Sequence, residues 1–226
     1  MRAVPVAKNY KLSYADQGED VVLSRVLKQC AKYRPGQGGF YLDIGAYHPV
    51  QKSVTKRLYD AGWSGICMDI SRESIRLFEA HRPRDIAVCA AAGRERGEIT
   101  AYYLEDEISI LNTTDPAEAA RLAKSGAKIR EDKIPVRTVD EVMDEYAPGR
   151  KIDVMNIDVQ RTELDVLAGL SFDRYAPMVI AVEIHTNSID SALQTPIAGF
   201  LRYQGYVPVA SCVITMFWYR KQAAGG

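Results

Sequence analysis

One stretch of the sequence decides the fold: Gly39-Phe40-Tyr41-Leu42-Asp43-Ile44-Gly45-Ala46-Tyr47-His48-Pro49. Its apolar first half predicts a short buried strand over residues 40–44. An acid lies near the end of this strand, and a glycine follows where the backbone must turn and can pass close to a ligand. The stretch therefore predicts a core strand and one edge of a binding site.

Strand and helix patterns alternate on both sides of this stretch. Further strands are expected over residues 65–70, 86–91, 134–137, 152–159 and 178–184, with an exposed or edge strand over 98–104. Helices are expected over residues 16–30, 51–61, 71–81, 115–125, 139–146, 163–170 and 189–203, the last kinked or split at Pro196. The closing strands, 206–209 and 213–219, are joined too tightly for a crossover helix, so they must be antiparallel if they pair.

This order of elements predicts an α/β protein with a doubly wound sheet that helices cover on both faces. The sheet should be mostly parallel, with an antiparallel C-terminal strand pair. A length of 226 residues suits a single domain over residues 1–226. Within it we expect a helical lead-in over 1–38 and a sheet core over 39–220.

The composition narrows the class of protein. The 29 Lys and Arg residues balance 29 Asp and Glu residues, so the chain lacks the broad positive field that favours binding to nucleic acid or anionic lipid. No run approaches the ~18 apolar residues of a membrane span, and the N-terminus lacks the apolar core of a signal peptide. The four cysteines are widely spaced, which favours buried reduced thiols. We therefore expect a cytoplasmic protein with a small-molecule partner and no nucleic acid; its oligomeric state stays open.

The ends of the first two core strands indicate the kind of ligand. Ligands of open α/β sheets bind beyond the carboxyl ends of the strands, and Asp43 and Asp69 lie there. An acid in the position of Asp69 can accept hydrogen bonds from a ribose diol. Gly45 is followed by Tyr47 and Pro49, not by the Gly-x-Gly-x-x-Gly pattern that brings a pyrophosphate up to a helix. An adenosine ligand without phosphate therefore fits better than a nicotinamide or flavin dinucleotide.

A set of ordered motifs resembles the FkbM-type methyltransferases. Besides the stretch 39–49, they are Ser13-Tyr14-Ala15-Asp16-Gln17-Gly18-Glu19-Asp20, Tyr59-Asp60-Ala61-Gly62-Trp63-Ser64-Gly65, Met68-Asp69-Ile70, Leu111-Asn112-Thr113, Ile157-Asp158-Val159-Gln160 and Glu163-Leu164-Asp165-Val166-Leu167. The resemblance extends over most of residues 13–206. It implies a class I (Rossmann-like) methyltransferase sheet of seven strands with the last pair reversing. It also implies S-adenosylmethionine as cofactor and O-methylation of sugars or other natural-product hydroxyls.

The strand ends and the resemblance together predict the residues of the cofactor site. These are Asp43, Gly45, Ala46, Tyr47, Ser53, Asp69, Ile70, Ala91 and Asp158. Asp69 should hold the ribose, and the turn at Gly45 should admit the methionine end. At the start of the first helix, Gln17, Glu19 and Asp20 match the family, which suggests that they cover the cofactor; a solvated helix start is the alternative.

Methyl transfer needs an oriented acceptor and a base for its hydroxyl. We expect His185, after the fifth core strand, to be this base, supported by the acids Asp158 and Glu183; His48 is a weaker candidate. An acid such as Glu183 inside an apolar strand has to be paired or bound to a metal. The favoured interpretation has no metal. In the alternative, Asp158, Glu183 and His185 hold one divalent ion.

One motif departs from the family pattern. Gln160-Arg161 stands where the family commonly has Glu-Gly, which places a long cation where the backbone was free to approach a ligand. We expect Arg161 to face the acceptor, and we expect the acceptor walls in segments 105–133 and 186–195. The leading hypothesis is an O-methyltransferase for a sugar-like hydroxyl. An N-methyltransferase and a non-catalytic S-adenosylmethionine-binding module are the alternatives.

Overall fold

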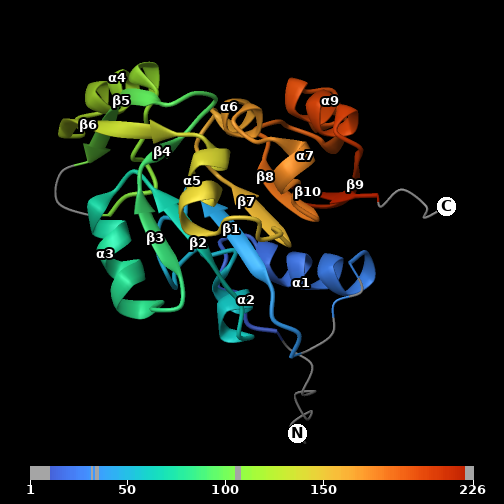
Figure 1. The fold of residues 1–226 in the computed structure, drawn as a ribbon. Helices are drawn as coiled ribbons and strands as arrows, with labels where there is room; N and C mark the ends of the chain where they lie inside the picture. The colour runs from blue at the N-terminus through green and yellow to red at the C-terminus, as the bar shows by residue number, and fades with distance from the viewer. Residues whose placement is uncertain (1–10, 32, 34–35, 105–107, 222–226) are drawn as a thin grey trace, which may run out of the picture.

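The computed structural model describes residues 11–31, 33, 36–104 and 108–221, and a seven-stranded sheet forms its centre. The strands of this sheet, in their order across it, are β3 (Ile86–Cys89), β2 (Ser64–Asp69), β1 (Phe40–Ile44), β7 (Val154–Ile157), β8 (Val179–Glu183), β10 (Thr215–Arg220) and β9 (Tyr206–Cys212) (Figure 1). The first five are parallel, and β10 runs antiparallel to both of its neighbours. The prediction of a mostly parallel, doubly wound sheet with an antiparallel C-terminal pair is confirmed.

Helices cover both faces of this sheet because both faces of its strands are apolar. In β1, for example, Leu42 belongs to one core cluster and Tyr41 to the other. The first cluster includes side chains of α5 (Val139–Tyr146), α6 (Glu163–Ala168), α7 (Phe172–Tyr175) and α9 (Pro196–Tyr203). The second includes side chains of α1 (Glu19–Gln29), α2 (Lys56–Asp60) and α3 (Arg72–His81). The helices and the sheet therefore form three layers.

A second sheet lies with α4 (Pro116–Lys124) at one end of the molecule (Figure 1). Its order is β4-β6-β5, formed by β4 (Ala91–Ala92), β6 (Ile129–Arg137) and β5 (Gly97–Leu104). The short strand expected over 134–137 is thus longer than predicted and lies outside the central sheet. Its first half is highly charged and carries no apolar alternation, so only its antiparallel pairing with β5 makes it a strand. The strand expected over 86–91 likewise divides between the two sheets.

Two predicted helices differ from the structure in instructive ways. The helix expected over 51–61 is reduced to α2 because turns occupy its first half: Nδ1 of His48 accepts hydrogen bonds from the amides of Val50 and Gln51. The helix expected over 189–203 is split as predicted. It forms α8 (Ile189–Ala192) and α9, which begins at Pro196 with the Thr195 side chain as its cap.

The cysteines follow the prediction in part. All four are free, but only Cys67 is buried, whereas Cys30, Cys89 and Cys212 are partly exposed. Within the described ranges, no helix has both the length and the apolar character that a membrane crossing requires.

Candidate functional site

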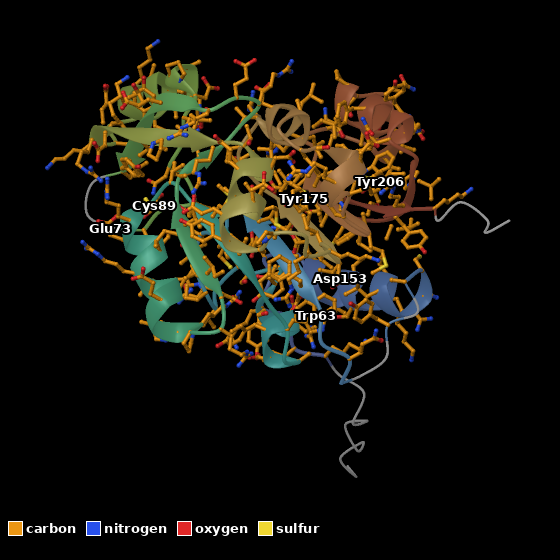
Figure 2. The ribbon with its side chains drawn as sticks, viewed as in Figure 1. Trp63, Glu73, Cys89, Asp153, Tyr175 and Tyr206 are labelled. Carbon is orange, nitrogen blue, oxygen red and sulfur yellow. The ribbon has the colours of Figure 1, made fainter. Side chains whose placement is uncertain are left out.

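The carboxyl ends of the parallel strands open into a cavity of about 480 Å³, here called the first cavity. Figure 2 helps to locate this edge of the sheet: Cys89 ends β3 there, whereas Trp63 and Asp153 directly precede β2 and β7 at the opposite edge. The strand order reverses between β1 and β7, which is where open α/β sheets bind ligands. The volume is in the range of small-molecule sites. Six of the predicted cofactor residues line the first cavity: Gly45, Tyr47, Asp69, Ile70, Ala91 and Asp158.

Asp69 lies at the end of β2 and holds the turns on either side of it. Its Oδ2 accepts a hydrogen bond from the amide of Tyr47, and its Oδ1 accepts one from the amide of Ser71, both at 2.8 Å. Burial raises the pKa of Asp69 to about 6, although these two amides oppose the rise. Each carboxylate oxygen can accept a second hydrogen bond. Asp69 can therefore receive a diol from the first cavity while it holds the backbone.

The structure gives Gly45 a role besides the predicted one. Its φ is 78°, and a Cβ at this position would lie 1.7 Å from the carbonyl oxygen of Asp158. The adjacent strand end by itself therefore requires the glycine. Gly45 still lines the first cavity, because the turn that it permits forms part of the wall.

Three described residues predicted for the cofactor site, Asp43, Ala46 and Ser53, lie outside the lining of the first cavity. Asp43 is buried and accepts hydrogen bonds from Thr55 Oγ1 at 2.5 Å and Asn156 Nδ2 at 2.9 Å. The Oγ of Ser53 accepts one from Arg82 at 2.7 Å. Side chains alternate along a strand, so Asp43 shares the face of Tyr41 and points toward the layer of α2 and α3. These residues stabilise the protein beneath the site.

The predicted cover at the start of α1 also lies elsewhere. Asp20 is buried and accepts hydrogen bonds from Ser13 Oγ, the Tyr14 amide and Arg57 Nε, which tie the segment before α1 to α2. The exposed Gln17 accepts a hydrogen bond at its carbonyl oxygen from Cys212 Sγ of β9. Both residues lie outside the lining of the first cavity. The third residue of this predicted cover, Glu19, is buried and lies close enough to Glu183 for its charge to raise the pKa of that acid.

A second cavity of about 280 Å³ adjoins the first. Ile110, Asn112, Thr113 and Gln160 line both and so form the junction. The remaining walls are Leu111, Asp115, Glu118, Arg121, Arg161 and His185. Residues 110–121 come from the segment predicted to hold the acceptor, of which 105–107 lie outside the described residues. The other predicted segment, 186–195, contributes no residue to either lining.

Asp158, Glu183 and His185 meet at the ends of β7 and β8, as predicted from the order of the strands. Asp158 lines the first cavity and His185 lines the second. Between them, Glu183 approaches Asp158 within hydrogen-bonding range, and its Oε2 lies 3.4 Å from His185 Nε2. This Oε2 is buried and makes no hydrogen bond to any described residue. Gln160 Nε2 donates to Asp158 Oδ1 at 2.9 Å.

The electrostatics of this group are those of two acids that share a proton. Burial, followed by the adjacent Asp158, raises the pKa of Glu183 to about 9, and the like charges of Glu163 and Glu19 contribute. Burial also raises the pKa of Asp158, against the hydrogen bonds from Glu183 and Gln160. With a pKa of about 9, Glu183 is protonated at neutral pH, and the two acids titrate as a pair. Within its apolar strand Glu183 lies beside Asp158 and His185, and its Oε2 has no hydrogen-bond partner among the described residues. Among the described residues no three His, Cys, Asp or Glu side chains are placed to hold a metal ion.

Comparison with known proteins identifies the family. The profile of the methyltransferase FkbM domain matches residues 43–208. The chain belongs to this family. No curated protein matches the chain. Among solved structures, the crystal structure of methyltransferase FkbM from Methylobacillus flagellatus KT gives a TM-score of 0.47 at 14% identity, covering 83% of this chain and 44% of that one. The chain thus spans less than half the length of that FkbM protein.

Several cavity residues of this FkbM domain were not predicted from the sequence. Asn112 and Thr113 lie in the segment predicted as an acceptor wall, but the sequence does not indicate that they also line the first cavity. Arg94 and Asp165 form an ion pair of 3.2 Å, and both line the first cavity. They lie 71 positions apart in the chain, so only the fold reveals their contact. His48, the weaker candidate base, serves its turn and lies in neither lining.

Proposed function

We propose that this FkbM domain transfers a methyl group from S-adenosylmethionine to a hydroxyl of a small, sugar-like acceptor. The observation that carries the proposal is the pair of adjoining cavities. One contains an acid suited to a ribose at the switch point of the sheet, and the other contains a histidine beside a protonated acid. A site for a nucleoside and a site for an acceptor thus share the junction at Gln160 and Asn112.

The residues of the first cavity fit S-adenosylmethionine better than a dinucleotide. Asp69 can accept hydrogen bonds from a ribose diol. Ile70, Ala90 and Ala91 offer an apolar wall of mostly small residues for a flat base. Residues 45–55 separate β1 from α2, so no helix begins at Gly45 to receive a pyrophosphate. When bound, S-adenosylmethionine would supply an electrophilic methyl group on a sulfonium sulfur.

The residues around the junction would orient the acceptor and manage its proton. We assign His185, in the wall of the second cavity, as the group that takes the proton of the acceptor hydroxyl. Glu183 Oε2 lies 3.4 Å from His185 Nε2, which suits an acid that holds the orientation of the ring. Asp158 lies beside the protonated Glu183, and its carboxyl oxygens can accept a hydrogen bond from the acceptor at the side of the first cavity. Asn112 and Gln160 supply neutral amide groups at the junction.

The cofactor assignment is tested by calorimetry with S-adenosylmethionine and S-adenosylhomocysteine. Replacing Asp69 by Ala should weaken binding by ~1.5–3 kcal/mol, because hydrogen bonds to a charged group contribute about that much. Since the pKa of Asp69 is about 6 and the ionised carboxylate is the better acceptor, affinity should be full above pH 7 and fall as the pH drops through 6.

The matched control is Asp173→Asn, which removes an exposed acid on α7 and should leave the affinity unchanged. Unchanged affinity in a folded Asp69→Ala variant would remove Asp69 from the site, and a wild-type protein that binds neither compound would overturn the proposal. A panel of hydroxyl and amine acceptors then distinguishes O-methylation from N-methylation. Cofactor binding with no methylated acceptor would indicate a binding module.

A further inference from the structure

Arg161 occupies a backbone position that is unfavourable for any side chain. Its φ is 91°, directly after Gln160 at 57°, and glycine adopts such conformations without steric cost. The Arg161 amide donates to Glu163 Oε1 at 3.0 Å, which holds the turn into α6. Any residue except proline could supply this amide, so the hydrogen bond does not explain the arginine. A strained side chain kept in a cavity wall suggests a function for that side chain.

The charged residues that line the second cavity explain why a cation is useful at this position. Its other arginine, Arg121, is bound to Glu118 by two hydrogen bonds, from Nε to Oε2 at 2.8 Å and from Nη2 to Oε1 at 2.5 Å. The carboxylate of Asp115 caps α4 by accepting from the Ala117 amide at 2.8 Å. Both acids in the wall are therefore engaged within α4. Arg161 is exposed. Its charge helps to lower the pKa of Glu118, after Arg121, but no described residue forms an ion pair or a side-chain hydrogen bond with its guanidinium.

We propose that Arg161 binds an anionic group on the acceptor, a carboxylate or a phosphate ester, so that the methyl acceptor is an acidic sugar-like compound. The inference rests on the proposed function only in identifying this ligand as the acceptor. A guanidinium offers planar paired donors that match either anion. Arg161 and His185 both line the second cavity, and Asn112 and Thr113 extend it to the junction. The anion therefore binds at Arg161 while a hydroxyl of the same molecule reaches the junction.

The test compares three probes of one size class: methyl glucoside, methyl glucuronide and glucose 6-phosphate. Calorimetry is performed on the full chain, with and without saturating S-adenosylhomocysteine. The wild type should bind one of the two anionic probes at least ~10-fold more tightly than the neutral glucoside, since hydrogen bonds to a charged group contribute that much. Arg161→Gln should abolish this preference, and Arg161→Lys should keep part of it. Arg25→Gln, an exposed arginine on α1, is the matched control and should change nothing.

A third variant separates binding from a structural role. Arg161→Gly relieves the strained backbone, so it should raise the midpoint of thermal unfolding by about 2–4 °C while it abolishes the anion preference. An arginine with only a structural role would instead lower the midpoint on removal and leave binding intact.

The proposal is overturned if the wild type shows no preference for either anionic probe, or if Arg161→Gln keeps the preference. Its failure is distinct from failure of the proposed function. A protein that prefers the anion but does not bind S-adenosylhomocysteine supports the anion site and contradicts the cofactor assignment. A protein that binds S-adenosylhomocysteine but shows no preference for the anion supports the cofactor assignment and excludes Arg161 from acceptor recognition.

Discussion

Two buried polar clusters of this protein differ in how their acids are compensated. The first, the Arg82 network, consists of Arg82, Ser53, Thr55, Asp43 and Asp85. Arg82 is fully buried and donates to Ser53 Oγ, Thr55 Oγ1 and the carbonyl oxygen of Pro49 at 2.7–2.9 Å, and it lies 3.6 Å from Asp85 Oδ2. Thr55 in turn donates to Asp43. Arg82 thus connects both acids, and each of its three guanidinium nitrogens donates a hydrogen bond.

The second, the carboxyl cluster, consists of Asp158, Glu183, Glu163 and Glu19 together with His185. Asp158 and Glu183 lie side by side, and the charges of Glu163 and Glu19 act on Glu183. No described lysine or arginine lies within ion-pair distance of Asp158 or Glu183. Burial and like charge hold the pKa of Glu183 at about 9, and its Oε2 lacks a hydrogen bond. A hydrogen-bonded network around a buried cation stabilises a fold, whereas a group of buried acids without a cation, with perturbed pKa values and beside a cavity, is typical of a reactive site. The comparison therefore distinguishes residues that stabilise the fold from residues of the candidate active site.

The largest effect expected from this comparison is on stability, at Arg82. Arg82→Met should lower the free energy of unfolding by about 3–5 kcal/mol, because Asp43 and Asp85 would lose the cation that offsets their burial. Urea denaturation measures the change. Arg84→Met is the matched control, since Arg84 is exposed, and it should cost less than about 1 kcal/mol. An equal decrease in the free energy of unfolding of the two variants would show that the Arg82 network does not stabilise the fold.

In the carboxyl cluster, a substitution should affect turnover instead of stability. His185→Ala should lower turnover by ~100-fold or more with nearly unchanged cofactor affinity, the range usual for loss of a general base. His81→Ala, at the exposed end of α3, is the control and should be silent. We expect turnover to persist in chelator. Complete loss in chelator that magnesium or manganese restores would instead make Asp158, Glu183 and His185 metal ligands.

The smallest predicted effect is the pH dependence of stability at Glu183. Its pKa is about 9 in the folded protein against an ordinary value of 4.5 for a glutamate, so between these pH values the folded state keeps a proton that the unfolded state loses. Stability should therefore fall as the pH rises from 5 to 8. Glu183→Gln should remove this loss and stabilise the protein by roughly 1–3 kcal/mol at pH 8, and by much less at pH 5.

Urea denaturation at pH 5, 6.5 and 8 measures this difference. The control Glu79→Gln removes an exposed acid of α3 and should leave the slope with pH unchanged. A Glu183→Gln variant with the wild-type slope would show that the carboxyl cluster is better satisfied than its geometry indicates.

Both clusters also show where prediction from the sequence stops. The central strands and most helices could be predicted because their apolar patterns are local, and Glu183 could be recognised because an acid stands out in such a strand. The position of Asp43 near the carboxyl end of a core strand predicts contact with the cofactor. Its partners Thr55, Asn156 and, through Thr55, Arg82 lie 12 or more positions away in the chain, so only the fold shows that it is engaged.

The sequence by itself determined the layered α/β fold, the family, and the set of acids at the strand ends, because these depend on residue types at fixed local spacing. Tertiary structure decided the rest. It assigned β6 to a second sheet through pairing with β5, joined residues 110–121 to His185 around one cavity, and put Arg161 at a φ of 91° in its wall. These features depend on contacts between segments that are distant in the chain and on backbone angles. The local pattern of residue types specifies neither the contacts nor the angles.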